Sequence, residues 1–191
     1  MNSNYMTDPL IFIIDSLVSL YILAIMLRFL LQWCRADFYN PISQFLVKIT
    51  HPILKVLRRY IPPLGRIDTS SIVLALSLQM LADYTILFLK GFGISIGALA
   101  LLSFGNIVSL LINVFIYAVF ARAILSWLNP GSFNTASSIL HSLTEPLLET
   151  CRKFIPDFGG IDLSPLIVLM VLQLSKMVIL PPIQQLASLI S

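Results

Sequence analysis

Four long apolar runs constrain this chain more than any other feature of its sequence. They cover residues 10–31, 70–89, 106–128 and 165–180, and few charged residues interrupt them. A helix needs about 20 consecutive apolar residues to cross the hydrocarbon core of a bilayer. Only 11% of the residues are charged, whereas a soluble domain carries roughly 25%. The sequence therefore predicts an all-α membrane protein with about four transmembrane helices.

An internal repeat with an offset of 94 residues divides the chain into two units. Identical Trp, Arg, Pro, Gly and Asp residues carry the match, so it is more than a general likeness of apolar helices. Each unit consists of a span, a loop and a span, so the two units are expected to be parallel. The matched motif residues of the first unit are Arg28, Trp33, Asn40, Thr50, Pro52, Arg58, Pro62, Gly65, Asp68 and Ser70. Those of the second unit are Arg122, Trp127, Asn134, Thr144, Pro146, Arg152, Pro156, Gly159, Asp162 and Ser164.

The expected boundaries follow from the apolar runs. The first repeat covers 1–90, with spans at 10–31 and 70–89, and the second covers 106–191. Its spans are 106–128 and 165–180, the latter closed by Pro181 and Pro182. Residues 91–105 read as an apolar linker punctuated by glycines. This segment could also extend the second span, form a shallow hairpin or supply a fifth helix.

The loop of each repeat predicts an amphipathic helix, at 41–60 and at 135–154. Asn40 followed by Pro41 is a typical helix start. Apolar residues recur with helical spacing along one face of each segment, and polar residues occupy the other. Pro52 and Pro146 lie inside the helices and should kink them. We expect both helices near the membrane plane, where they either cap the bundle or bind lipid or another membrane protein.

Lysine and arginine residues set the expected orientation. The loop between the first two spans carries Arg35, Lys48, Lys55, Arg58, Arg59 and Arg66, whereas the opposite side offers only Lys90. Positively charged loops stay in the cytoplasm. Both motif loops are therefore predicted to be cytoplasmic and both termini periplasmic.

The motif residues resemble the YggT/YlmG family of small integral membrane proteins. The likeness rests on R-x-x-L-x-W, a following Asn, T-x-P-[IL]-L, R-[RK]-x-I-P and G-x-I-D-x-S, each present twice. It covers the chain from about Leu17 to Gln173. The resemblance implies a bacterial inner-membrane protein without enzymatic activity. It also implies links to osmotic tolerance and potassium homeostasis, or to cell division.

No catalytic, cofactor-binding or metal-binding constellation is evident in the sequence. Arg28 and Arg122 lie near span ends, where they can reach toward lipid headgroups, or they can pair with Asp68 and Asp162. These aspartates can equally start the return helices, with Ser70 and Ser164 as caps.

Four polar residues fall inside predicted spans: Gln79, Asp83, Gln173 and Lys176. Charges in hydrocarbon are expensive unless they are paired. The repeat offset puts Lys176 one residue from the equivalent of Asp83, so the two are expected to pair.

Two functions remain open from the sequence. The first is a non-enzymatic assembly or scaffold protein that engages lipid or an unidentified membrane protein through its cytoplasmic helices. The alternative is a small channel or transport-associated protein that uses the four intramembrane polar residues. Nucleic acid is not an expected partner, because the basic loop is short and interleaved with apolar residues.

Overall fold

The computed structural model describes residues 4–65, 67–128, 134–153 and 162–190, without the side chains of 4–6 and 127. The helices are α1 (Asn4–Trp33), α2 (Pro41–Leu57), α3 (Thr69–Leu89), α4 (Ile96–Leu128), α5 (Thr135–Arg152) and α6 (Ser164–Ile190). Four of them, α1, α3, α4 and α6, are long and apolar enough to cross a membrane. The predicted all-α fold with two span–loop–span repeats is confirmed.

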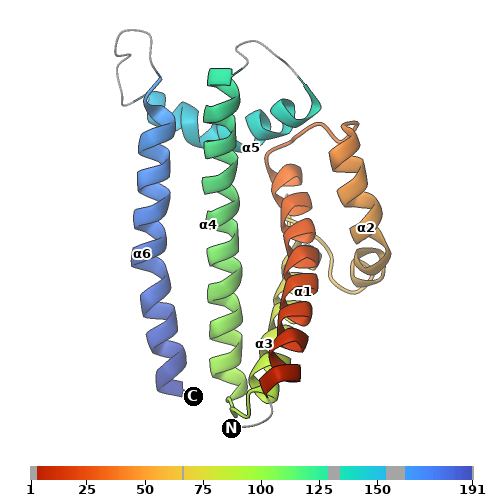
Figure 1. Ribbon diagram of the computed structural model, residues 1–191. Coiled ribbons are helices and arrows are strands. Elements are labelled where there is room, and N and C mark those ends of the chain that lie inside the picture. Colours follow the sequence, from red (N-terminus) through yellow and green to blue (C-terminus); the bar gives the residue numbers. More distant parts are fainter. Residues whose placement is uncertain (1–3, 66, 129–133, 154–161, 191) are drawn as a thin grey trace.

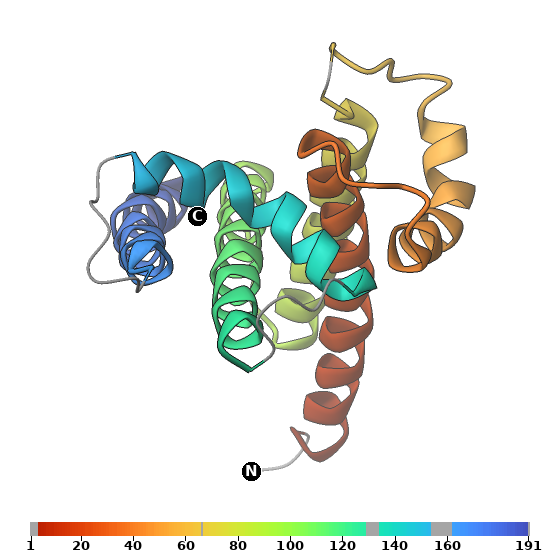
Figure 2. The same cartoon turned by 90° about the horizontal axis from the view of Figure 1, so that it is seen from above.

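The four long helices run side by side, with both termini at one end and α5 at the other (Figure 1). We call these the terminal end and the loop end. Helix α3 packs against α1 and α4, while α6 packs against α4 and α5. Figure 2 shows the result from above: α4 lies between α6 and the α1–α3 pair. The spans therefore form an open row, and α6 stands at its edge.

The apolar core is a thin layer between neighbouring helices. Ile22 and Ile25 of α1 pack with Leu74 of α3, Leu54 of α2 and Ile107 of α4. A smaller cluster of Val119, Leu148 and Val168 joins the helices of the second repeat. Many large apolar side chains on the outer faces are exposed, as expected where lipid tails replace water.

The predicted linker 91–105 is shorter than expected, because α4 begins at Ile96. Gly91 takes a positive φ of 77° in the turn after α3, a conformation that glycine adopts without strain. The Ser95 hydroxyl then accepts a hydrogen bond from the Ala98 N–H at 3.2 Å, which caps the new helix. Residues 96–105 are thus the first turns of α4, which none of the three alternatives anticipated.

Glycines in this segment allow close packing rather than a flexible link. A Cβ built on Gly105 would lie 3.2 Å from Ile183 Cγ2, and one built on Gly97 would lie 3.4 Å from Ile190 Cγ2. Small residues let neighbouring membrane helices approach each other closely. They bring α4 against the last turns of α6.

Helix α6 continues past Pro181 and Pro182 to Ile190, so the predicted end of the fourth span at 180 is wrong. Proline removes a backbone donor and usually breaks a helix in water. Membrane helices tolerate it where neighbouring helices, side chains or local backbone adjustments satisfy the groups that proline leaves free.

Helices α2 and α5 occupy the two loops, each with its proline inside. Helix α5 crosses the row of spans, in line with the prediction (Figures 1 and 2). The first part of α2 instead runs along α1, and only its last turns lie across. The prediction of an in-plane helix is therefore wrong for the first part of α2, which is held against α1 by the buried contacts described below.

Candidate functional site

Two clusters of arginine side chains, one in each repeat, lie where the loop helices meet the spans. In the first repeat, Arg28 of α1 is buried and its Nη1 donates to Thr50 Oγ1 of α2 at 2.7 Å. Thr50 is fully buried and in turn donates to the Leu46 carbonyl at 2.7 Å. This chain of bonds fixes α2 to α1.

The return of the chain into α3 is fixed by a second ion pair. Arg58 forms a salt bridge to Asp68 Oδ2, and Ser71 Oγ donates to the same oxygen at 2.7 Å. Burial alone would raise the pKa of Asp68, but the hydrogen bonds and the Arg58 charge outweigh it and lower the pKa below its ordinary value. The sequence suggested Arg28 as the partner of Asp68; in the structure Arg58 is the partner, and Arg28 donates to Thr50 instead.

Nearby motif residues complete this turn of the chain. Ser70 does not cap α3; it donates to the Ile61 carbonyl at 2.7 Å, and Asp68 is the residue that precedes the helix. The Pro62 carbonyl accepts from Thr69 Oγ1 at 2.7 Å. Gly65 has φ 60° in a tight turn, a conformation that strains other residues. Each matched residue here therefore has a role in the turn.

The second repeat reproduces this geometry. Arg122 Nη1 donates to Thr144 Oγ1 at 2.9 Å, and Thr144 donates to the Leu140 carbonyl at 2.7 Å. Arg152 Nη2 contacts Asp162 Oδ2 at 2.8 Å. The backbone N–H of Ser164 donates to Asp162 Oδ1 at 2.9 Å, so Asp162 both pairs and starts α6.

One substitution between the repeats changes the charge of the cluster. Glu145 stands where the first repeat has His51, and it contacts Arg122 Nη2 at 2.6 Å and Arg152 Nη1 at 3.1 Å. Burial acts to raise the pKa of Glu145, but Arg122, His141 and Arg152 lower it overall. The second cluster (Arg122, Thr144, Glu145, Arg152, Asp162) is thus electrically balanced. The first cluster (Arg28, Thr50, Arg58, Asp68) keeps one positive charge in excess.

The two loop helices are also joined to each other. Asn40 caps α2 by accepting from the Ile42 N–H at 2.9 Å, and its Nδ2 donates to the Thr135 carbonyl at the start of α5 at 2.8 Å. Asn134 caps α5 through a reciprocal pair of bonds with Ser137. The predicted cap at Asn40 is present, and Asn40 has the additional role of linking the repeats.

The other predicted motif positions are less engaged. Trp33 is 60% exposed and its ring centroid lies 6.0 Å from that of Phe29. Pro52 and Pro146 lie inside their helices. The side chain of Trp127, and the whole of Pro156 and Gly159, lie outside the described residues.

The expected pairing of Asp83 with Lys176 is wrong. Asp83 accepts from Gln79 Nε2 at 3.0 Å, Ser103 Oγ at 2.8 Å and Asn106 Nδ2 at 3.2 Å. Lys176 instead donates to Asn113 Oδ1 at 2.9 Å. The repeat offset gave the two charges similar depths but could not show that α4 stands between their helices.

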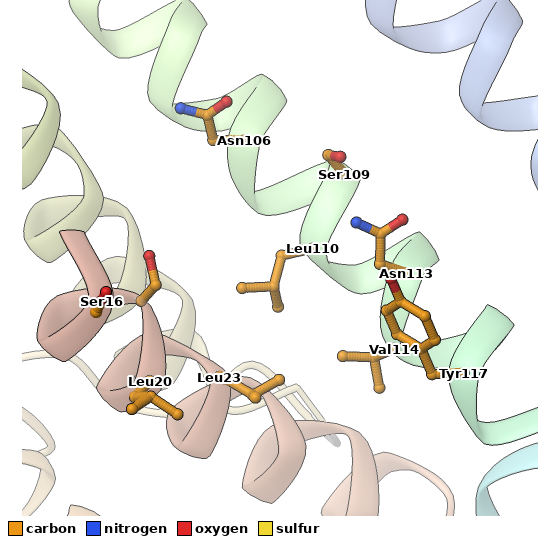
Figure 3. Close-up of a pocket in the computed structure, with 10 residues that line it drawn as sticks. Ser16, Leu20, Leu23, Asn106, Ser109, Leu110, Asn113, Val114 and Tyr117 are labelled. Carbon is orange, nitrogen blue, oxygen red and sulfur yellow. The ribbon is translucent and has the colours of Figure 1, made fainter. Parts of the chain in front are cut away.

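Helix α4 supplies the partners of both charges, a role that the sequence reasoning missed. Ser103, Asn106, Ser109 and Asn113 form a polar row in this helix at spacings of three, three and four residues, a signal that was available. Part of this polar row lines an open groove of about 540 Å³ between α1 and α4, opposite Ser16 and Ser19 (Figure 3). Neither Asp83 nor Lys176 is among the residues that line this groove.

The free surfaces of the two loop helices differ. Helix α2 buries Ser43, Leu46, Thr50 and Leu54. On an adjacent face it exposes four large apolar side chains, which we call the free face of α2: Ile42 (42% exposed), Phe45 (61%), Ile53 (44%) and Val56 (62%). No large apolar side chain of α5 is exposed to this degree among the described residues. A shallow groove of about 520 Å³ beside α2 is lined by Phe38, Gln44, Val47, Lys48, His51 and Pro52.

Comparison with known proteins gives a family match over both repeats. A family described as CCB3/YggT matches residues 7–89 and again residues 101–183. An uncharacterised protein of Pseudomonas aeruginosa is 44% identical over 172 residues, which are 89% of this chain and 87% of the relative. A protein of Haemophilus influenzae is 38% identical over 159 residues (83% and 84% of the two chains). The protein of Escherichia coli K12 named YggT is 35% identical over 170 residues (89% and 88%). No solved structure matches.

Proposed function

The chain belongs to the CCB3/YggT family, and from that premise we propose that it is a non-enzymatic scaffold of the bacterial inner membrane. In this proposal the loop end lies in the cytoplasm, and α2 docks another membrane protein there. The single observation that supports it best is the free face of α2, which is apolar, exposed and held on a rigid base.

The rigidity of that base supports docking over gating. Thr50 and Asp68, which anchor α2 to its two neighbouring spans, are 0% and 2% exposed. A helix fixed by two buried contacts presents a constant surface, and a pre-organised surface loses little conformational entropy on binding. Interfaces commonly surround such an apolar centre with polar residues, and the exposed Lys48 follows Phe45 of the free face by about one turn of α2.

The transport alternative, with its link to osmotic and potassium homeostasis, finds less support. It required Gln79, Asp83, Gln173 and Lys176 to face one another in a hydrated core. Asp83 and Lys176 are instead bound to different residues of α4, Asp83 to Ser103 and Asn106 and Lys176 to Asn113, and they do not contact each other. We therefore keep the scaffold as the proposal.

Site-specific photo-crosslinking in native membranes tests this function. A benzophenone amino acid at Val56 should form adducts with one or a few discrete proteins. The matched control is Thr150, the repeat equivalent of Val56, which is also exposed but lies on α5. Phe45→Glu, on the same face, should abolish the Val56 adducts while Asp83→Asn leaves them unchanged. Adducts with lipid alone at Val56, or equal protein adducts at Thr150, would contradict the proposal.

A further inference from the structure

One face of α6 carries a polar side chain that finds no partner within the described chain. This face consists of Leu166, Met170, Gln173 and Met177, which we call the α6 seam. Leu166, Met170 and Met177 are 57%, 58% and 61% exposed, and Gln173 is exposed as well. The seam is separate from the face that packs on α4, where Val168 and Ala187 are buried.

The spacing of the seam is that of a helix-packing surface. Its residues follow one another at intervals of four, three and four, and Leu180 continues the series. Apolar positions with this mean spacing of 3.5 residues form the contact line of two helices that cross at a small angle. A single polar residue within such a line typically fixes the register and the number of helices.

The repeat shows how the same face is used in the first unit. The offset of 94 residues maps Met170, Gln173 and Met177 onto Leu76, Gln79 and Asp83 of α3. That side of α3 faces α4: Leu76 packs against the cluster that contains Ile107, and Asp83 accepts from Ser103 and Asn106. In the second unit no described helix covers the corresponding side of α6.

Gln173 also lacks the hydrogen bond that its counterpart makes. Gln79 is 9% exposed and donates to Asp83, but Met177 stands at the position equivalent to Asp83. Gln173 lies nine residues into α6, or about 14 Å at the rise of an α-helix, well inside a bilayer. An amide at this depth favours helix association, because its donors and acceptor find no partner among lipid tails.

We infer that the α6 seam binds the same seam of a second copy of this chain. Two copies inserted in the same direction are parallel, so a two-fold axis along the membrane normal places the two Gln173 side chains at equal depth. An amide both donates and accepts, so these two side chains can bond to each other reciprocally. Lys176 does not obstruct this contact, since it is held toward α4 by Asn113.

The first helix of a second copy is a poorer occupant of the seam. The repeat offset places Pro9 and Phe12 of α1 where α4 has Ser103 and Asn106. Neither side chain can hydrogen-bond to an amide, so α1 would leave Gln173 unpaired. The symmetric contact of α6 with α6 satisfies it.

Cysteine crosslinking in native membranes tests this arrangement. With Cys34 and Cys151 replaced by alanine, Gln173→Cys should form a disulfide-linked dimer upon mild oxidation, and Met170→Cys and Met177→Cys should do so less strongly. The control is Val178→Cys, which is 69% exposed on another side of α6. Equal dimer yields at 173 and 178, or no dimer at 173, would overturn the inference. Crosslinking of Gln173→Cys only to a co-expressed Phe12→Cys chain would overturn it too.

A second experiment measures the contribution of the Gln173 amide to dimerisation. Labelled copies are diluted in lipid nanodiscs or vesicles, and energy transfer between them reports the dimer fraction. Gln173→Leu should weaken dimerisation by about threefold to tenfold, as expected for one hydrogen-bonded contact between membrane helices, whereas Gln173→Asn should largely retain it. An unchanged dimer fraction for Gln173→Leu would refute a role for the amide. This result is independent of the proposed docking at α2, which is at a different helix and is read out by different adducts.

Discussion

At the scale of single residues, the two arginine clusters share the same geometry but differ in how far their aspartates are exposed. Asp68 is 2% exposed, whereas the side chain of Asp162 is 43% exposed. Asp68 Oδ1 is buried and accepts no hydrogen bond in the described part of the chain, so the Asp68 charge depends on the contacts of Oδ2. Asp162 can be solvated, and Arg152 is shared with Glu145.

This difference predicts unequal effects of removing the two equivalent arginines. Arg58→Gln should destabilise the protein by about 3 kcal/mol, since it leaves a buried carboxylate without its cation. Arg152→Gln should cost about 1 kcal/mol or less, as for an exposed ion pair. Unfolding in mixed micelles, followed by circular dichroism, measures both variants. Equal losses would show that burial does not distinguish the clusters, and Arg59→Gln serves as an exposed control in the same turn after α2.

The residues of these clusters could be found from the sequence, but their partners could not. The duplication singled out Arg28, Thr50, Arg58 and Asp68 because each recurs 94 residues later. Which arginine meets Asp68 depends on how α2 bends and packs, and no spacing along the chain encodes that. The sequence did not single out Glu145, because the first repeat has His51 at the equivalent position. Glu145 nevertheless contacts two motif arginines.

At the scale of helices, the sequence determined which segments are helical better than where they end. Capping by Asn40 and Asn134 was predictable because Asn at a helix start has a local signature. The start of α4 was missed, although Ser95 caps it by the same chemistry, because the surrounding glycines suggested a linker. The end of α6 was missed because tolerance of Pro181 and Pro182 depends on the lipid environment and not on local propensity.

The two cap residues predict a second pair of unequal effects. Asn134→Ala should cost about 1 kcal/mol for the loss of one helix cap. Asn40→Ala should cost about 2 kcal/mol, because it also removes a partly buried hydrogen bond to the Thr135 carbonyl of the other repeat. Hydrogen–deuterium exchange should show faster exchange in the first turn of α5 for Asn40→Ala, although the substituted residue lies in the other repeat. Unchanged protection of α5 would mean that this link does not stabilise it.

At the scale of the whole molecule, the even number of spans brings both termini to the terminal end, opposite α5 (Figure 1). The repeat predicted this parallel arrangement, since each unit begins and ends on the same side. What it could not predict is the open row of helices. A two-fold bundle would have closed α6 onto α1, but α6 packs only on α4 and α5 within the described chain. The face left uncovered on α6 is the one that we assign to a second copy.

The distribution of charge over the two ends predicts their orientation in the cell. The loop between α1 and α3 carries Lys48, Lys55 and Arg59, whereas the turn between α3 and α4 carries Lys90 alone. Basic residues near span ends remain cytoplasmic. In a chain without its native cysteines, Gly93→Cys should therefore react with an impermeant maleimide in intact cells, since a side chain at Gly93 would meet no atom within 4 Å. Arg59→Cys, which is also exposed, should react only after permeabilisation. Labelling of Arg59→Cys in intact cells, with Gly93→Cys protected, would place the loop end outside and would contradict a cytoplasmic partner for α2.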